Sequence, residues 1–184
     1  MTPLEKNNKS FGYALTELNE YRFSLDGVEL QLPMSFADLE QAGWEYQGDE
    51  TEIIEVGPYG SYWSGIWKKE EFTIFTRPYN NSDSAVQIKD CLIVGIKASE
   101  SESLPLFKEY SGEFILPGGI KLFESTKYDV LIAYGEPEDA SSDYNEISYM
   151  TGEFSGVTFY YSESAEKITG VLYMNIPWPI NFSD

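Results

Sequence analysis

The sequence predicts an α+β fold in which two tandem helix-plus-antiparallel-meander repeats form one curved antiparallel sheet with helices on one face. Three observations predict it. The chain has 184 residues, of which 42% are hydrophobic and 16% aromatic, enough to form a core despite a strong net charge. Its two halves show the same order of features. Each half also ends in segments rich in β-branched and aromatic residues, as strands are.

The likeness of the two halves rests on matched positions. Each half begins with an extended segment containing a Gly turn, continues with a short helix that carries Asp, and ends that helix with Gly. The pattern therefore indicates a duplicated unit. With single-residue insertions, the matched pairs are Phe23 with Phe114, Gly27 with Gly118, Val28 with Ile120, Leu30 with Leu122, Asp38 with Asp129 and Gly43 with Gly135.

Each unit is expected to contain one short helix of about ten residues. In the first, Phe36, Leu39 and Ala42 are spaced to bury one face. Gly43 and Gly135 tolerate the positive φ that often ends a helix, so both helices should stop there.

Strands are expected after each helix, because aromatic and β-branched residues alternate there between Gly, Asn and Ser clusters. Short turns separate them, which favours antiparallel meanders. The expected strands span 64–67, 72–77 and 88–97 in the first half, and 146–150, 156–161 and 167–174 in the second.

Composition divides the chain into four parts. Residues 1–22 form an N-terminal tether and an extra helix over 11–21, with Leu15 and Leu18 facing inward. Residues 23–98 form repeat 1, the polar, acidic stretch 99–112 is a connector, and 113–184 form repeat 2. The last repeat ends in an extended Pro-rich tail, expected to dock through Trp178.

Charge excludes several classes of partner. With 12 Lys and Arg against 31 Asp and Glu, the chain has a net charge of −19. Such a surface repels the phosphate backbone of nucleic acids and anionic membranes, and no apolar run is long enough to span a bilayer. We expect a monomer that binds a protein partner, and a basic one suits this field. The alternative is that the acidity serves solubility alone.

An enzymatic role is not expected. The chain has no His, which removes Ser-His-Asp and Cys-His arrangements, and its single cysteine, Cys91, lies in a predicted core strand. Asp38 and Asp129 are better explained as helix-start residues than as a catalytic pair. The acidic loop 138–143 lacks the spacing of a calcium loop. We therefore expect no catalytic residues, no metal site and no cofactor.

Aromatic residues are the candidate binding residues. Tyr59, Tyr62, Trp63 and Trp67 occupy a Gly- and Ser-rich segment, where such side chains could anchor a partner. The alternative is that Trp63 and Trp67 pack in the core. On the strands of the second half, aromatic side chains alternate, so one face should be open to a partner. The candidates there are Tyr149, Tyr161 and Tyr173, alongside Phe159 and Tyr160.

The order of a Gly turn, an Asp-bearing helix that ends at 134–137 (Tyr-Gly-Glu-Pro) and strands closing at 168–172 (Ile-Thr-Gly-Val-Leu) resembles a known unit. β-Lactamase inhibitor proteins and the small lipoproteins of the outer-membrane barrel-assembly machine share it. The tandem copy over 23–174 is more similar to the inhibitors, although their paired cysteines are missing. The resemblance implies a secreted or surface-tethered, non-catalytic protein-binding module.

Three functions remain open. The first is a non-enzymatic protein-binding module that acts outside the cytoplasm. Residues 1–10 are polar and lack the apolar stretch of a signal peptide, so this reading requires an export signal that is absent from the given chain. The alternative is a cytoplasmic, acidic immunity protein that neutralises a toxin. A glycan-binding or glycan-cleaving protein that uses aromatic platforms ranks third.

Overall fold

The structure is a computed structural model. It describes residues 11–57, 63–70, 72–99, 112–137, 139–141, 145–162 and 167–176, of which 139–141 are described by their backbone alone. The predicted tether 1–10, most of the predicted connector (100–111) and the tail 177–184 with Trp178 lie outside these residues.

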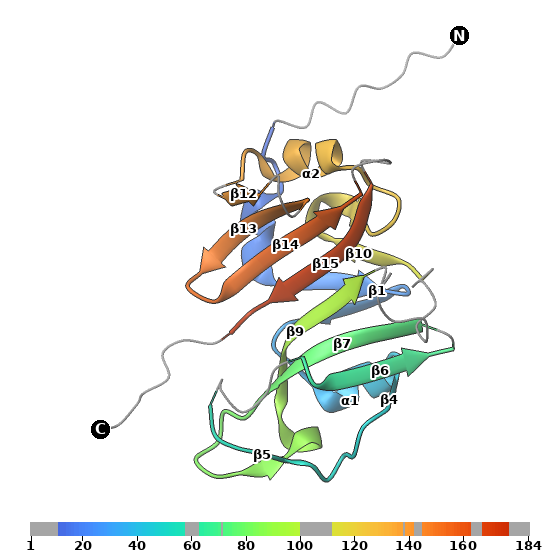
Figure 1. Cartoon of the computed structure of the whole chain (residues 1–184), viewed down its shortest axis with the longest axis vertical. Coiled ribbons are helices and arrows are strands. Elements are labelled where there is room, and N and C mark those ends of the chain that lie inside the picture. Colours follow the sequence, from blue (N-terminus) through green and yellow to red (C-terminus); the bar gives the residue numbers. More distant parts are fainter. Residues whose placement is uncertain are drawn as a thin grey trace.

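A nine-stranded antiparallel sheet forms the front of the molecule (Figure 1). Its order is β12-β13-β14-β15-β9-β7-β6-β4, and β3 also pairs with β9. Strands β15 and β9 are distant in sequence but adjacent at the centre, where Leu172 lies opposite Lys97. The strands are β3 (Met34–Ser35), β4 (Glu45–Tyr46), β6 (Gly65–Lys69), β7 (Phe72–Tyr79), β9 (Leu92–Ser99), β12 (Asp139–Ser141), β13 (Glu146–Gly152), β14 (Ser155–Tyr161) and β15 (Ile168–Met174).

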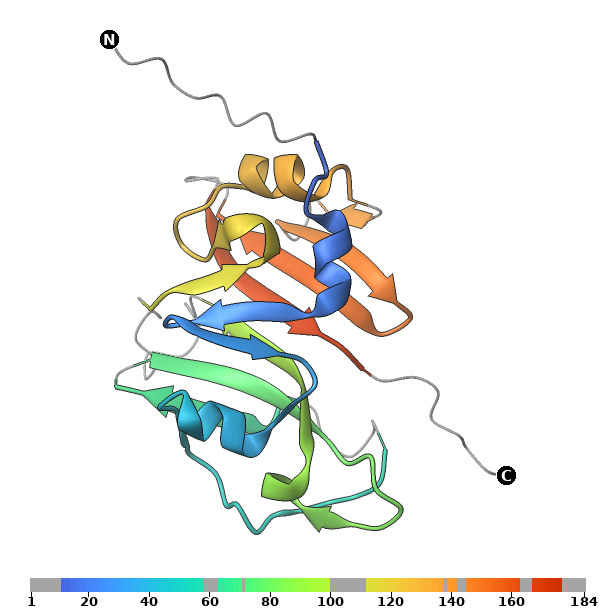
Figure 2. The same cartoon turned by 180° about the vertical axis from the view of Figure 1, so that it is seen from behind.

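A second, four-stranded sheet lies behind the first, together with the helices (Figure 2). Its order is β11-β10-β1-β2, so it joins strands from both halves of the chain. A two-stranded sheet, β5 with β8, lies at one end. These strands are β1 (Arg22–Leu25), β2 (Val28–Gln31), β5 (Ile53–Ile54), β8 (Val86–Gln87), β10 (Phe114–Leu116) and β11 (Ile120–Lys121). The helical elements are η1 (Leu15–Glu20), α1 (Phe36–Gln41), η2 (Ile88–Asp90), η3 (Pro117–Gly119) and α2 (Lys127–Tyr134).

The main core lies between the two larger sheets. Phe23 of β1 packs edge-on against Phe114 of β10, with ring centroids 5.3 Å apart, and against Tyr173 of β15 at 6.3 Å. The Tyr173 hydroxyl donates a hydrogen bond to the carbonyl of Leu18 in η1 at 3.0 Å. These buried contacts tie η1 and the small sheet to the large one.

The predicted fold class is wrong. The structure is mostly β, with 49% strand and 19% helix, and its strands form several antiparallel sheets and not one sheet covered by the helices of two repeats. The physical reason lies in two extended segments of similar sequence. Ser24 of β1 pairs with Ile115 of β10, so these segments form a sheet that takes much of the place expected for helices.

Local predictions fared better. Each of the six expected strands is present within a few residues, although the first residues of 88–97 form η2. Gly43 and Gly135 follow the two α-helices with φ of +85° and +87°. The expected helix over 11–21 is shorter, and Leu18 is buried as predicted, but Leu15 is exposed because it lies on the outer side of η1.

Both α-helices begin with a capping box. The amide of Ser35 donates to Asp38 Oδ2 at 2.7 Å, and the amide of Asp38 donates to Ser35 Oγ at 3.3 Å. Thr126 and Asp129 repeat the arrangement at the same distances. The two aspartates therefore stabilise helix starts, as the sequence predicts. None of the helices in the described part of the chain has the length and hydrophobicity to cross a membrane.

Candidate functional site

The candidate site is the face of the large sheet that lies opposite the small sheet and the helices, here called the open face. Figure 1 shows the sheet from this side. Side chains alternate along a strand, and Tyr173 and Ile96 point into the core, so their neighbours point the other way. Strand register assigns to the open face Ile66, Lys68, Thr73, Phe75, Arg77, Gly95, Lys97, Ser99, Glu146, Ser148, Met150, Gly156, Thr158, Tyr160, Gly170, Leu172 and Met174, and Trp63 joins them through its contact with Gly95.

Trp63 lies on the backbone of the central strand β9. A Cβ atom on Gly95 would come 3.0 Å from Cη2 of Trp63 and 3.1 Å from Cγ of Met174. The indole therefore occupies the space that glycine leaves, with Met174 beside it. A glycine inside a strand often marks such a close approach. Trp63 is half-buried, so this packing leaves part of its side chain on the surface.

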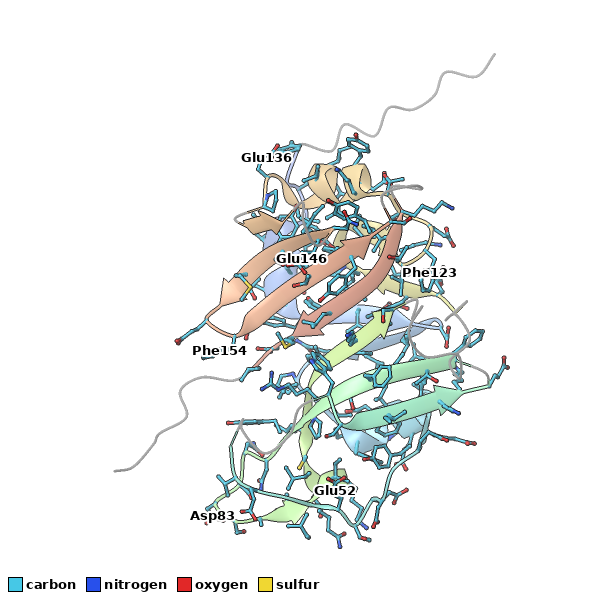
Figure 3. All side chains as sticks on the ribbon, viewed as in Figure 1. Glu52, Asp83, Phe123, Glu136, Glu146 and Phe154 are labelled. Carbon is cyan, nitrogen blue, oxygen red and sulfur yellow. The ribbon has the colours of Figure 1, made fainter. Side chains whose placement is uncertain are left out.

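A second aromatic ring lies over a glycine of the neighbouring strand. A Cβ atom on Gly170 of β15 would come 3.2 Å from Cδ2 of Tyr160 and 3.0 Å from Cβ of Ser99. Burial raises the pKa of Tyr160, and the carboxylate of Glu146 on the adjacent strand raises it further. The Tyr160 hydroxyl thus keeps its proton at neutral pH and can donate a hydrogen bond. Figure 3 shows Glu146 on the same side of the sheet.

Lys97 is the central cation of the open face. It lies opposite Leu172 on one side and Phe75 on the other, and it is half-buried. Its alkyl chain can lie along these apolar neighbours while the ammonium group reaches water. Within the residues assigned to this face, Glu146 is the acidic one. The centre of the face is therefore apolar and weakly cationic, although the protein as a whole is strongly acidic.

Hydroxyl and thioether groups complete the face toward β13. Ser148 Oγ and Thr158 Oγ1 form a hydrogen bond of 2.9 Å across two strands. Met150 is exposed at 45%. Its flexible, polarisable side chain is of the kind that adapts to varied apolar surfaces.

The structure separates the predicted binding residues. Trp63 lies on the open face, whereas Tyr59 and Tyr62 lie outside the described residues. Tyr161 is half-buried at the edge of the core, where Lys127 Nζ lies 5.0 Å from its ring centroid.

Trp67, Tyr149 and Tyr173 are buried in the core, with exposed fractions of 0%, 3% and 0%. The expectation that they line an open face is wrong. Each polar atom is satisfied internally: Trp67 Nε1 donates to Thr76 Oγ1 at 3.0 Å, and the hydroxyl of Tyr149 donates to the carbonyl of Gly135 at 2.7 Å. Burial also raises the pKa of both tyrosines. Alternation predicts two faces of a strand, but it does not say which one the core covers.

Sequence reasoning missed Lys97, Leu172 and Met174 as surface residues. A signal was present, because Gly95 and Gly170 interrupt otherwise strand-like segments. Glycine in a strand indicates a bulge or a close contact. Here both glycines lie beneath half-buried aromatic rings, Trp63 over Gly95 and Tyr160 over Gly170. The two glycines therefore mark the open face in the sequence.

Other potential sites have structural explanations. The Cys91 thiol is buried, and desolvation together with the charge of Asp90 raises its pKa to about 11, so it is not a reactive thiolate at neutral pH. Within the described ranges, no three His, Cys, Asp or Glu side chains come together as a potential metal site.

The resemblance to the β-lactamase inhibitor proteins stays a prediction, because no protein-family model, curated protein or solved structure matches the chain.

Proposed function

We propose that the chain is a non-enzymatic protein-binding module whose open face docks a protein partner, with Trp63 as the central anchor. The observation that carries the proposal is the position of Trp63 over Gly95. Glycine inside a strand lowers the stability of the fold by about 0.5–1 kcal/mol relative to alanine. Gly95 therefore carries a small cost in stability, and it leaves the space that the indole fills. A half-buried indole held in this way supplies a large, stiff contact surface that loses little entropy on binding.

The chemistry of the surrounding side chains supports a protein ligand. Aromatic residues and Met are enriched at the centres of protein interfaces, and Trp and Tyr are enriched among the residues that contribute most to binding. Side chains of these kinds lie together at the centre of the open face, namely Trp63, Tyr160, Leu172 and Met174. Ser148, Thr158 and Ser99 supply hydroxyl groups that suit a polar margin.

Charge determines the kind of partner. The net charge of −19 creates a field that speeds the encounter with a basic protein. At the point of contact, Lys97 favours an acidic side chain of that partner, which would be desolvated beside Leu172 and Phe75. The proposed partner is therefore basic overall and carries an apolar patch with a carboxylate at its centre. We further propose that the module is a monomer and that it acts outside the cytoplasm, the second of which the resemblance implies.

A second candidate function is a cytoplasmic immunity protein that covers the basic active site of a toxin. It is favoured by a local acidic segment near β5. The pKa of Tyr46 is raised to about 12 by burial and then by the charges of Glu52, Asp49 and Glu50. Figure 3 shows Glu52 at the end of the molecule that carries β5. In this case the acidic segment, and not the open face, would contact the partner.

Affinity capture with the intact chain, followed by measurement on the purified partner, tests the proposal. Trp63→Ala should raise the dissociation constant at least 10-fold, because such anchors contribute roughly 2 kcal/mol or more to binding. Tyr128→Ala removes an exposed aromatic ring from α2 and serves as the matched control, with no expected loss. Lys97→Glu should weaken binding as well.

The same measurements separate the two functions. If the partner binds Trp63→Ala as tightly as the wild type but is lost on Glu50→Lys with Glu52→Lys, the immunity function holds and the open face is not the docking surface. A ligand that proves to be a polysaccharide would contradict both.

A further inference from the structure

Strand register arranges the side chains of the open face in rows that cross the sheet. The register of β7 and β9, continued two residues beyond Phe75 and Lys97, places Ser99 opposite Thr73. Figure 1 shows the strands of this row side by side. The row is a line of hydroxyl groups with a cation at one end and a carboxylate at the other. From β6 to β13 it consists of Lys68, Thr73, Ser99, Gly170, Tyr160 and Glu146.

The Thr73 hydroxyl is the unusual member of this row. Its neighbour Ile74 is fully buried in the core, so alternation directs the Thr73 side chain to the open face. Thr73 is nevertheless only 8% exposed, and its Oγ1 atom is buried without a hydrogen-bond partner in the described part of the chain. A buried hydroxyl left unpaired is unfavourable, and few native groups are in this condition. The position therefore favours a ligand that accepts a hydrogen bond from Thr73.

A second threonine of β7 shows the contrast. Thr76 is 1% exposed, and its Oγ1 atom accepts a hydrogen bond from Trp67 Nε1 at 3.0 Å. Thr76 points into the core, whereas Thr73 points to the open face, where the residue opposite it on β6 is Lys68. The core thus satisfies its own threonine, and the unpaired hydroxyl belongs to the face that is available to a ligand.

The charge around Thr73 is positive. The cations of the open face are Lys68, Arg77 and Lys97, and with Glu146 they give it a net charge of +2 on a chain whose net charge is −19. Lys68 lies directly opposite Thr73, and Lys97 is the diagonal neighbour of Thr73 on β9. Such positions are roughly 5 Å and 8 Å apart. Because lysine side chains are long and flexible, both ammonium groups can reach a ligand bound at Thr73.

Hydroxyl donors, two ammonium groups and an apolar neighbour define the chemistry of the ligand. A carboxylate accepts hydrogen bonds on both oxygens, and its hydrogen bonds to charged donors are strong. Phe75, the next residue of β7 on this face, offers apolar surface to the carbon chain that carries the carboxylate. We propose that the row binds a carboxylate group between Thr73 and Ser99, with one oxygen accepting a hydrogen bond from each hydroxyl. Lys68 and Lys97 neutralise its charge.

Two sources could present this group, namely an acidic side chain of a partner protein and a free small carboxylate. As the receptor for a side chain of a partner, the site rests on the function proposed for the open face. Since Thr73 Oγ1 is closed to water, a flexible neighbour has to turn aside as the ligand enters. Lys68, directly opposite, has the rotatable side chain for this movement.

The test is an NMR titration of the intact chain with sodium butyrate at constant ionic strength. It follows the methyl group of Thr73 and the backbone amides of Lys68 and Ser99, and saturable shifts are expected at all three. Neutral n-butanol and cationic n-butylammonium have the same carbon chain and should give no saturable shifts. Equal shifts with n-butanol would overturn the proposal. Tighter binding of inorganic phosphate than of butyrate would also contradict a carboxylate site.

Variants of Thr73 separate the hydroxyl from the shape of the side chain. Thr73→Val should raise the dissociation constant of butyrate roughly 10-fold or more, because a hydrogen bond to a charged group is lost. Thr73→Ser keeps the hydroxyl and should bind butyrate nearly as well as the wild type. Without butyrate, Thr73→Val should have at least the melting temperature of the wild type, since no internal hydrogen bond is removed. A lower melting temperature would show that the hydroxyl is already paired and would reject the site.

Variants of lysine separate a site from a general charge effect. Lys68→Gln should raise the dissociation constant of butyrate about 3-fold, as expected for one partly solvated ion pair. Lys89→Gln removes one charge from an exposed residue of η2 and should leave binding unchanged. Equal weakening by the two variants would mean that butyrate responds to net charge alone, and it would contradict the proposal.

A final comparison identifies the source of the carboxylate. Butyrate is compared with a capped peptide that contains one Glu between Gly residues. Tighter binding of the peptide assigns the site to a protein side chain, tighter binding of butyrate assigns it to a free carboxylate, and failure of both rejects it. These titrations need no partner. Loss of butyrate binding with partner binding intact rejects the carboxylate site alone, whereas butyrate binding with a partner that is insensitive to Trp63→Ala rejects docking at the open face alone.

Discussion

Trp63 rests on Gly95: a Cβ atom at position 95 would approach Cη2 of the indole to 3.0 Å. Since the φ of Gly95 is not in the left-handed region, its role is to leave space and not to permit an unusual backbone. The ring position is therefore set by the absence of one methyl group on the neighbouring strand.

This relationship predicts a graded response to side-chain size. Gly95→Ala should shift the indole by a few tenths of an ångström, and Gly95→Val should displace it from the strand. The indole Hε1 resonance of Trp63 in a ¹⁵N-labelled protein should move little in the first variant and strongly in the second, with partner binding lost in parallel. An unchanged resonance in Gly95→Val would show that Trp63 does not lie there.

The two tryptophans of β6 and its preceding segment should differ in their effect on stability. Trp67 is fully buried, and the centroid of its ring lies 4.4 Å from the ring centroid of Phe36. Trp67→Ala should lower the free energy of unfolding by about 3–5 kcal/mol, because it leaves a large cavity. Trp63→Ala should lower it by about 1 kcal/mol or less. Urea unfolding measures both, and equal losses would contradict the assignment of the two rings to different faces.

The hydrogen bond between Trp67 of β6 and Thr76 of β7 gives a finer test of the core packing. Trp67 Nε1 donates to Thr76 Oγ1 at 3.0 Å in the core. Thr76→Val keeps the shape but removes the acceptor, so it should cost about 1–3 kcal/mol. Thr76→Ser retains the hydroxyl and should recover part of that loss. A Thr76→Val variant as stable as the wild type would mean that the bond contributes nothing.

Sequence signals of short range predicted much of this structure. Gly43 and Gly135 mark the ends of both α-helices, and Asp38 and Asp129 mark their starts. These features depend on contacts between residues three or four positions apart, so a local pattern is sufficient to find them.

Long-range pairing was the part that sequence could not supply. Phe23 and Phe114 are similar in their surroundings, and that likeness suggested equivalent positions in two repeats; in the structure the two rings touch. Likewise, alternation in β13–β15 gave two faces, but only the packing of β1 and η1 against Tyr173 shows which face is covered. The candidate site followed only once the covered face was known.

The capping boxes lead to a prediction for α2. Thr126→Ala removes the acceptor for the Asp129 amide and should cost about 1 kcal/mol. Thr126→Ser keeps the hydroxyl and should cost less. Thermal unfolding followed by circular dichroism measures both, and equal destabilisation by Ala and Ser would show that the methyl group, and not the capping hydroxyl, stabilises this helix start.

Tyr46 predicts a loss of stability at alkaline pH. Burial, aided by Glu52, Asp49 and Glu50, raises its pKa in the folded protein from 10.0 to about 12. Between these values the unfolded chain releases the phenolic proton while the folded protein retains it, so folding stability is full below pH 10 and declines as the pH rises toward 12. Buried Tyr149 and Tyr173 act in the same direction. The free energy of unfolding of Tyr46→Phe, measured with urea, should therefore decline less steeply than that of the wild type between pH 9 and pH 11.5 (about the range over which the unfolded phenol titrates).

Tyr128→Phe, at an exposed position of α2, is the control and should follow the wild-type curve. Because three carboxylates contribute to the shift, added salt should reduce the difference between Tyr46→Phe and the wild type. A decline of equal steepness in both proteins would show that the acidic segment near β5 does not act on Tyr46.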